Sequence, residues 1–168
     1  MKFIETALPG VLTVEPDVHR DARGFFLETF HARKYREGGI DAAFVQDNHS
    51  RSVRGTLRGL HGQRKKPQGK LVRAVQGEVF DVAVDIRSGK HVGVILSAEN
   101  FRQLWVPPGY LHGFCVVSET AEIEYKCTDL YDPADEIGAR WDSAGIDWPV
   151  KAPLLSARDA ALPPLDQL

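Results

Sequence analysis

Val79-Phe80-Asp81-Val82-Ala83-Val84-Asp85-Ile86 is the stretch that decides the fold, because its side chains follow a period of two. Successive side chains of a β-strand point to opposite faces of the sheet. The apolar side chains at the even positions therefore share one face, and Asp81 and Asp85 lie on the other. This pattern predicts a β-strand with one apolar face and one polar face.

A second strand is predicted at residues 121–127, where Tyr125 lies in an inward-facing apolar row and charged side chains occupy the opposite face. Many short strands bounded by turn residues are typical of an all-β sandwich or barrel. Ten prolines and fifteen glycines separate further predicted strands at residues 10–14, 25–30, 44–50, 56–61, 70–76, 92–96, 103–106 and 113–117.

Helical signals are few. His31–Glu37, followed by Gly38 and Gly39, predicts one short helix with a glycine stop. Ser156 is a suitable N-cap for a last helical turn. We expect residues 1–168 to form a single domain, with a C-terminal tail of about residues 145–168 that wraps over the barrel.

Length and composition exclude several classes of protein. The chain has 168 residues, and its formal net charge of −2 disfavours a dedicated nucleic-acid-binding protein. No apolar run reaches the ~18 residues of a membrane span, and the first ten residues show no secretion signal. Two cysteines are too few for a disulfide framework. We therefore expect a cytoplasmic protein with reduced thiols and no membrane or nucleic-acid partner.

Basic residues are concentrated in one part of the chain. Residues 48–77 contain no acidic side chain and eight of the 21 lysines and arginines. Arginine and lysine pair well with phosphate oxygens. The block therefore predicts a local anion site, such as a pocket for a phosphate or diphosphate. Chance clustering on a solvated surface is the alternative interpretation.

Three side chains of chemical interest lie on different predicted strands: His61, Lys70 and Tyr125. Each alone is compatible with a structural role, as a hydrogen-bonded core residue or as a side chain that extends to the surface. Together, beside a basic wall, they supply a base, a cation for an enolate and an acid. This combination favours proton abstraction next to a carbonyl group. Gln46 and Asn48 add a polar face to a neighbouring strand.

Pro107-Pro108-Gly109-Tyr110-Leu111-His112-Gly113 resembles the second signature of cupin barrels, in which a proline–glycine turn leads into a histidine. Most cupins bind a metal ion through an earlier His-x-His and a glutamate. Here the only upstream candidate is the lone His61, so three protein ligands cannot be assembled. We expect no metal site.

Further motifs follow one another in a specific order. They are residues 21–28 (DARGFFLE), 44–50 (FVQDNHS), 57–61 (LRGLH), 68–72 (QGKLV), 77–87 (GEVFDVAVDIR), 106–114 (VPPGYLHGF), 125–131 (YKCTDLY), Glu136 and 155–159 (LSARD). From about Gly10 to Asp159, the chain resembles the sugar-nucleotide 3,5-epimerases of the dTDP-4-dehydrorhamnose 3,5-epimerase type.

The resemblance implies a cupin-type jelly-roll barrel with short flanking helices, which works as a homodimer. The implied reaction inverts C3 and/or C5, beside the C4 keto group, of a nucleotide-linked 4-keto-6-deoxyhexose. It proceeds by deprotonation and reprotonation through an enolate, without a metal ion or other cofactor. The apolar N-terminal segment with Phe3, Ile4 and Leu8 is also suited to adding a strand to a partner's sheet edge.

The resemblance also assigns roles to individual residues. His61 corresponds to the base, Asp159 to its dyad partner, and Tyr125 to the acid that reprotonates the opposite face. Lys70 corresponds to the cation beside the enolate oxygen, and Tyr131 to the residue that stacks on the nucleotide base. The other implied substrate contacts are Arg23, Glu28, Gln46, Asn48, Arg58, His112, Glu136 and Arg158.

Strict strand alternation conflicts with one part of this assignment. It places Arg58 and His61 on opposite faces, although the resemblance assigns both to one site. A bulge or twist near Gly59 would resolve the conflict.

Other functions stay open at this point. Gly62 stands where family members usually carry an aromatic residue, and it borders the expected sugar pocket. The first alternative is therefore a monofunctional 3- or 5-epimerase, or an enzyme for another nucleotide sugar. A non-catalytic cupin that binds a sugar nucleotide is disfavoured, because binding alone needs no acid–base pair. A metal-dependent cupin oxygenase or isomerase is disfavoured by the incomplete ligand set.

Overall fold

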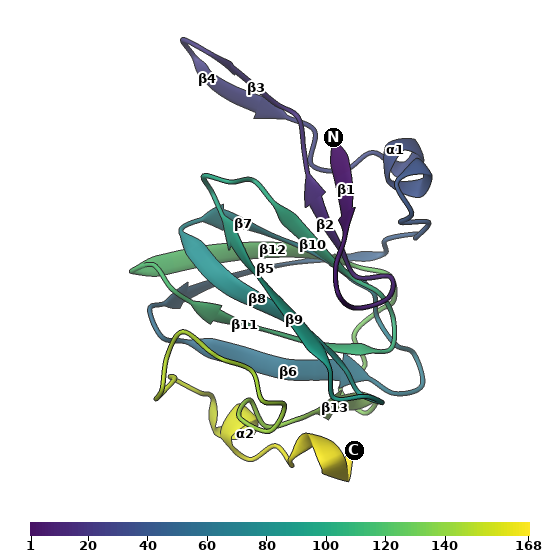
Figure 1. Ribbon diagram of the computed structural model, residues 1–168, viewed down its shortest axis with the longest axis vertical. Coiled ribbons are helices and arrows are strands. Elements are labelled where there is room, and N and C mark those ends of the chain that lie inside the picture. Colours follow the sequence, from purple (N-terminus) through teal and green to yellow (C-terminus); the bar gives the residue numbers. More distant parts are fainter.

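Two antiparallel sheets face each other in the computed structural model, which describes residues 1–168 (Figure 1). Consecutive strands mostly alternate between the sheets, as in a jelly roll. The larger sheet has the order β1 (Lys2–Glu5), β2 (Leu12–Glu15), β10 (Gln103–Val106), β7 (Lys70–Gln76), β12 (Thr120–Cys127) and β5 (Gln46–Val53). The smaller sheet has the order β13 (Glu136–Gly138), β6 (Leu57–Gln63), β11 (Tyr110–Val116), β8 (Glu78–Asp85) and β9 (His91–Ser97).

The remaining elements are short and flank the two sheets. They are the hairpin of β3 (Val18–Asp21) and β4 (Gly24–Leu27), helices α1 (Ala32–Glu37) and α2 (Ala157–Ala160), and a 3₁₀ turn at Leu165–Gln167. No helix is long and apolar enough to cross a membrane. The all-β prediction with short helices is confirmed, and each predicted strand overlaps an observed one. Strands β1, β3 and β13 were not predicted from the sequence, and they are only three or four residues long.

The barrel core lies between the two sheets. Val72 of β7 and Ile123 of β12 meet Val79 and Ala83 of β8 there, all of them buried. Burying a side chain of this kind stabilises the fold by about 1.5–3 kcal/mol. This apolar layer holds the sheets together, and polar side chains replace it where the two sheets enclose a cavity.

Asp81 lies inside the barrel, because the face of β8 that carries Val82 and Val84 points outward. Val82 and Val84 pack outward against Ile146, Trp148 and Leu165 of the C-terminal segment. This segment covers the outer face of the smaller sheet near β6 and β13 (Figure 1). The predicted alternation is therefore confirmed. Because the tail covers the face with Val82 and Val84, the face with Asp81 points into the barrel.

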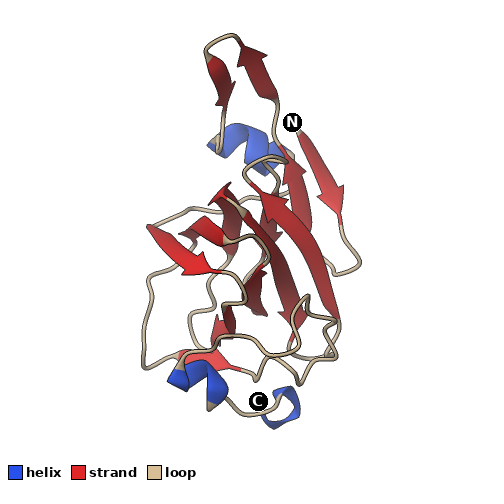
Figure 2. Ribbon diagram, turned by 90° about the vertical axis from the view of Figure 1, so that its left-hand side faces the viewer, coloured by secondary structure: helices blue, strands red, loops and turns tan.

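The β3–β4 hairpin projects away from the barrel (Figures 1 and 2). It carries Phe25 and Phe26, which are 56% and 71% exposed. Strand β1, in contrast, pairs with β2 of its own chain, with Phe3 opposite Val14. The N-terminal segment is thus already part of this chain's sheet, and the hairpin is the projecting apolar element.

Candidate active site

A cavity of about 470 Å³ opens between the two sheets, and both sheets contribute polar side chains to it. The smaller sheet and its tail supply His61, His112 and Asp159, and the larger sheet supplies Lys70 and Tyr125. Arg58 and Arg158 also line it, together with the hydroxyl side chains of Ser50, Thr56 and Ser156. Seven of the thirteen site residues expected from the sequence therefore line one cavity.

His61 and Asp159 form a hydrogen-bonded pair in this cavity. His61 Nε2 lies 2.6 Å from Asp159 Oδ1. Asp159 belongs to α2, whose N-cap is Ser156. The Ser156 Oγ accepts a hydrogen bond from the Asp159 backbone N–H at 3.0 Å. Burial alone would raise the pKa of Asp159, but the hydrogen bond and charge of His61 bring it below its usual range. Because Nε2 is engaged, Nδ1 is the ring nitrogen left to act as a base.

A bulge at Gly59 places Arg58 and His61 on the same face of β6. Gly59 has φ +126°, which favours glycine, and an added Cβ would lie 2.5 Å from Gly113 Cα. The pairing of β6 with β11 shifts here, since His112 lies opposite His61 but Phe114 lies opposite Arg58. The bulge expected from the sequence is confirmed.

Lys70 and Tyr125 lie on neighbouring strands of the opposite sheet, β7 and β12. Burial lowers the pKa of Lys70, whereas Cys127, Glu136 and Asp81 act in the opposite direction. Burial likewise raises the pKa of Tyr125, so its phenol stays protonated at neutral pH. The cavity therefore has an imidazole on one sheet and a phenol and an amine on the other.

A hydrogen-bonded chain connects Arg158 with three further expected residues that do not line the cavity: Glu136, Tyr131 and Gln46. Arg158 Nη2 pairs with Glu136 Oε2, and the Tyr131 hydroxyl lies 2.5 Å from the same oxygen. The Tyr131 backbone N–H donates to Gln46 Oε1 at 2.9 Å. Tyr131 is 47% exposed, so nearly half of the surface of this residue is accessible to solvent.

Asn48 and Arg58 are held by their neighbours. Gln46 Nε2 donates to Asn48 Oδ1 at 3.1 Å, and Asn48 Nδ2 lies 3.5 Å from Cys127 Sγ. Arg58 Nε donates to Ser52 Oγ at 3.0 Å, which leaves its two terminal nitrogens for an anion.

Arg23 and Glu28 lie outside this cavity in the same chain. Arg23 is at the tip of the projecting hairpin and pairs with Asp21 Oδ2 at 2.6 Å. Glu28 follows the hairpin and pairs with Lys34 Nζ at 2.9 Å. Neither side chain is among those that line the cavity.

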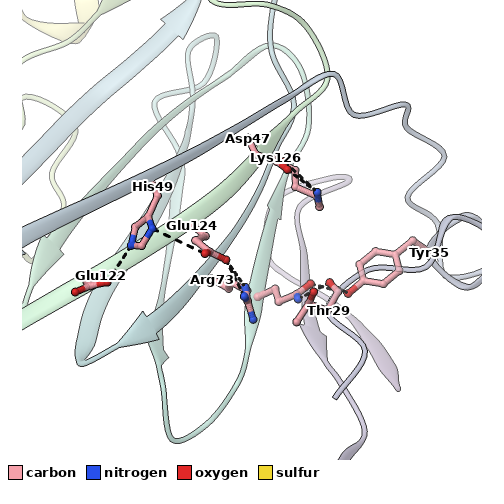
Figure 3. A network of polar contacts seen from close by, with 9 residues as sticks. Thr29, Tyr35, Asp47, His49, Arg73, Glu122, Glu124 and Lys126 are labelled. Atoms are coloured by element: carbon pink, nitrogen blue, oxygen red, sulfur yellow. Dashed lines mark hydrogen bonds and ion pairs between the residues drawn. The ribbon is translucent and has the colours of Figure 1, made fainter. Parts of the chain in front are cut away.

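The basic block does not form one continuous wall. Only Arg58 and Lys70 of its eight basic residues line the cavity. Arg73 instead pairs with Glu124 at 2.7 Å on the outer face of the larger sheet, beside the His49–Glu122 pair at 3.0 Å (Figure 3). Strand alternation sends neighbouring basic side chains to opposite faces, so the prediction of one anion-binding block is correct only in part.

Gly62 does not enlarge the cavity. A Cβ at this position would meet Leu111 Cδ2 at 3.0 Å and Ile137 Cγ1 at 3.7 Å. Leu111 and Ile137 belong to the apolar cluster under the tail. The expectation that Gly62 borders the sugar pocket is therefore wrong.

One buried polar residue at the site was missed. Asp81 has no exposed surface, and His112 Nε2 lies 3.0 Å and 3.1 Å from its two carboxylate oxygens. Its place on the polar face of β8 could not identify it, because alternation alone does not show which face of a strand points into the barrel. No cluster of three or more His, Cys, Asp or Glu side chains with a metal-binding arrangement is present.

Comparison with known proteins agrees with this geometry. The sequence profile of the dTDP-4-dehydrorhamnose 3,5-epimerase family matches residues 5–167. A dTDP-4-dehydrorhamnose 3,5-epimerase from Shigella flexneri is 54% identical over 95% of this chain and 93% of its own. A dTDP-4-dehydrorhamnose 3-epimerase from Streptomyces niveus is 38% identical over 95% of this chain and 81% of its own.

One solved structure has closely the same fold. It is a dTDP-6-deoxy-D-glucose-3,5-epimerase from Legionella pneumophila in complex with dTDP-4-keto-L-rhamnose. That structure is 48% identical in sequence, with a TM-score of 0.95 over 99% of this chain and 94% of its own. Sequence and fold agree, and the chain belongs to the dTDP-4-dehydrorhamnose 3,5-epimerase family.

Proposed function

We propose that this chain is an isomerase that inverts C3 and C5 of a dTDP-linked 4-keto-6-deoxyhexose. The observation that carries the proposal is the arrangement of acid and base across one cavity: His61 on β6 of the smaller sheet, Tyr125 on β12 of the larger. Inversion needs a proton removed from one face of a carbon and returned to the other. The 54% identity to a 3,5-epimerase, against 38% to a 3-epimerase, supports action at both carbons.

The proposed step begins when His61 Nδ1 takes the proton from the carbon beside the keto group. The electron pair of the broken C–H bond forms a C=C bond, and the negative charge moves to the C4 oxygen. The Lys70 ammonium stabilises that oxygen, which in such sites is worth about 3–4 kcal/mol. Tyr125 then protonates the opposite face of the carbon. Transfer of the extra proton from His61 through solvent to the tyrosinate resets the site, and the atoms balance.

The mouth of the cavity suits a nucleoside diphosphate. Arg58 and Arg158 line it, and guanidinium groups bind phosphate oxygens in pairs. Tyr131 offers a half-exposed ring for the base to stack on. Gln46, Asn48 and Glu136 are proposed as further substrate contacts at this rim.

Arg23 and Glu28 enter the proposal through a homodimer. In their own chain the two side chains lie outside the cavity, near a projecting hairpin with two exposed phenylalanines. A projecting apolar element of this kind favours contact with another protein surface. We propose that the hairpin packs on a second copy and brings Arg23 and Glu28 to the partner's cavity.

Incubation of the protein with dTDP-4-keto-6-deoxyglucose in D₂O tests the function. NMR should show deuterium at both C3 and C5 of the sugar, and His61→Ala should abolish the exchange while retaining nucleotide binding. Deuterium at C3 alone identifies a 3-epimerase, and at C5 alone a 5-epimerase. Absence of exchange in the unmodified protein contradicts the proposed function.

A further inference from the structure

A buried carboxylate lies behind the cavity without lining it. Asp81 is completely buried and is absent from the cavity wall, yet both of its oxygens are within 3.1 Å of His112 Nε2. An ionised carboxylate in an apolar interior costs several kcal/mol unless it is well paired. An apolar residue would pack between Val79 and Ala83 without that cost, so the carboxylate requires an explanation beyond packing.

The first consequence of Asp81 concerns the orientation of His112. A carboxylate only accepts hydrogen bonds, so Nε2 of His112 carries the proton in this contact. Nδ1 is then the ring nitrogen available to a ligand. The ring is further bounded by Phe114 and Tyr125, each with its centroid 6.4 Å away.

The second consequence concerns Lys70. Burial lowers the pKa of this side chain, and Asp81 is one of three groups that counteract the decrease. Removing the carboxylate charge therefore favours the neutral amine, which stabilises an enolate less well. The groups that act on Lys70 are Cys127 of β12, Glu136 of β13 and Asp81 of β8. The other titratable and charged side chains that line the cavity are Tyr125 on the same sheet and, across the cavity, Arg58, His61, His112, Arg158 and Asp159.

We infer that Asp81 is a positioning residue for the epimerisation. It orients His112 toward the sugar, and its charge favours the ammonium form of Lys70, which stabilises the enolate oxygen. The inference rests on the proposed function, and it assigns a role to a residue that does not touch the substrate. Groups that orient a functional side chain from behind, as the partners of metal-binding histidines do, typically contribute roughly 10–100-fold in activity.

Asp81→Asn is the test variant, and Asp135→Asn is its matched control. Asp135 is also a buried aspartate, but it accepts hydrogen bonds from the backbone N–H groups of Lys65 and Lys66. We expect Asp81→Asn to lower kcat by roughly 10–100-fold with little change in KM. The alkaline limb of its pH–rate profile should move to lower pH. Asp135→Asn should lose stability and keep both kcat and the profile.

Nitrogen-15 NMR of His112 in the unmodified protein gives a second test that does not depend on a folded variant. At neutral pH, Nε2 should be protonated, and addition of dTDP-4-keto-6-deoxyglucose should shift the Nδ1 resonance. A resting Nδ1–H tautomer, or a ligand shift at Nε2 alone, overturns the inference. So does a folded Asp81→Asn variant with the kcat and pH profile of Asp135→Asn. A lack of turnover in the unmodified protein instead contradicts the proposed function.

Discussion

His61 Nε2 lies 2.6 Å from Asp159 Oδ1, although the two residues are 98 positions apart in the chain. Asp159 reaches this place because Ser156 caps α2 and the tail carries this short helix to the edge of β6. The hydrogen bond leaves only Nδ1 of the imidazole for proton transfer. The contact therefore connects the C-terminal segment directly to the cavity of the barrel.

The dyad should behave as one unit in mutagenesis. We expect Asp159→Asn to lower the rate of hydrogen exchange at the sugar by roughly 10–100-fold. His61→Ala should remove the exchange, and the double variant should be no slower than His61→Ala alone. Exchange rates in D₂O for the three variants check this. Additive losses in log rate would show that the two side chains act independently.

The pKa of Asp159 also makes the stability of the fold depend on pH. Its folded-state value is below that of the unfolded chain, so the unfolded chain binds the proton more readily. The stabilisation is present above the unfolded value and disappears as the pH falls through the folded value. Urea unfolding should find Asp159→Asn less stable than the unmodified protein at pH 7, with a difference that disappears in acid. A difference independent of pH contradicts this.

The charged form of Lys70 should destabilise the fold, whereas the charged form of Asp159 stabilises it, although stability rises with pH in both cases. Burial depresses the folded-state pKa of Lys70, so the charged amine destabilises the fold below that value, and the penalty is removed as the pH rises toward the unfolded value of 10.5. Lys70→Met should therefore raise the free energy of unfolding at pH 7 while activity falls. Lys126→Met is the control, because Lys126 pairs with Asp47 at 3.0 Å on the outer face. Equal effects of both changes on stability refute the interpretation.

Tyr125→Phe should separate exchange from inversion. The variant keeps the His61 base, so deuterium still enters from one face, but the proton donor for the other face is lost. Net epimerisation should fall by roughly 10²-fold or more. Tyr35→Phe is the control, since the Tyr35 hydroxyl lies within hydrogen-bond distance only of the acceptors Thr29 O and Gln103 Oε1, outside the cavity. It should cost about 1–2 kcal/mol of stability and leave both activities unchanged. Equal retention of exchange and epimerisation in Tyr125→Phe removes its catalytic role.

The proposed dimer can be tested by mixing two impaired chains. Arg23→Ala should form dimers of reduced activity, and His61→Ala should form inactive dimers. If the hairpin serves the partner's cavity, mixed dimers contain one intact site, and activity should reappear after subunit exchange. Light scattering at micromolar concentration should give the mass of a dimer. A monomeric mass, or no recovery on mixing, argues against this arrangement.

Much of the fold is determined by local sequence patterns. Alternation in residues 79–86 and 121–127 predicted β8 and β12, and the observed bounds of β7 and β10 are those predicted. The N-cap at Ser156 was also predictable, because a cap depends on residues a few positions apart. The motifs assigned to the cavity brought together His61, Lys70, Tyr125 and Asp159, as the structure shows.

Only the tertiary structure decided which face of each strand is covered, and by what. The same alternation that separates Asp81 from Val82 cannot tell which side becomes the barrel interior. That choice depends on the packing of Ile146 and Trp148, more than 60 positions later, against the outer face of β8. Gly62 and Arg73 were misplaced for a related reason. The direction of a side chain from a strand follows from its neighbours in sequence, whereas its surroundings depend on segments that arrive from elsewhere in the chain.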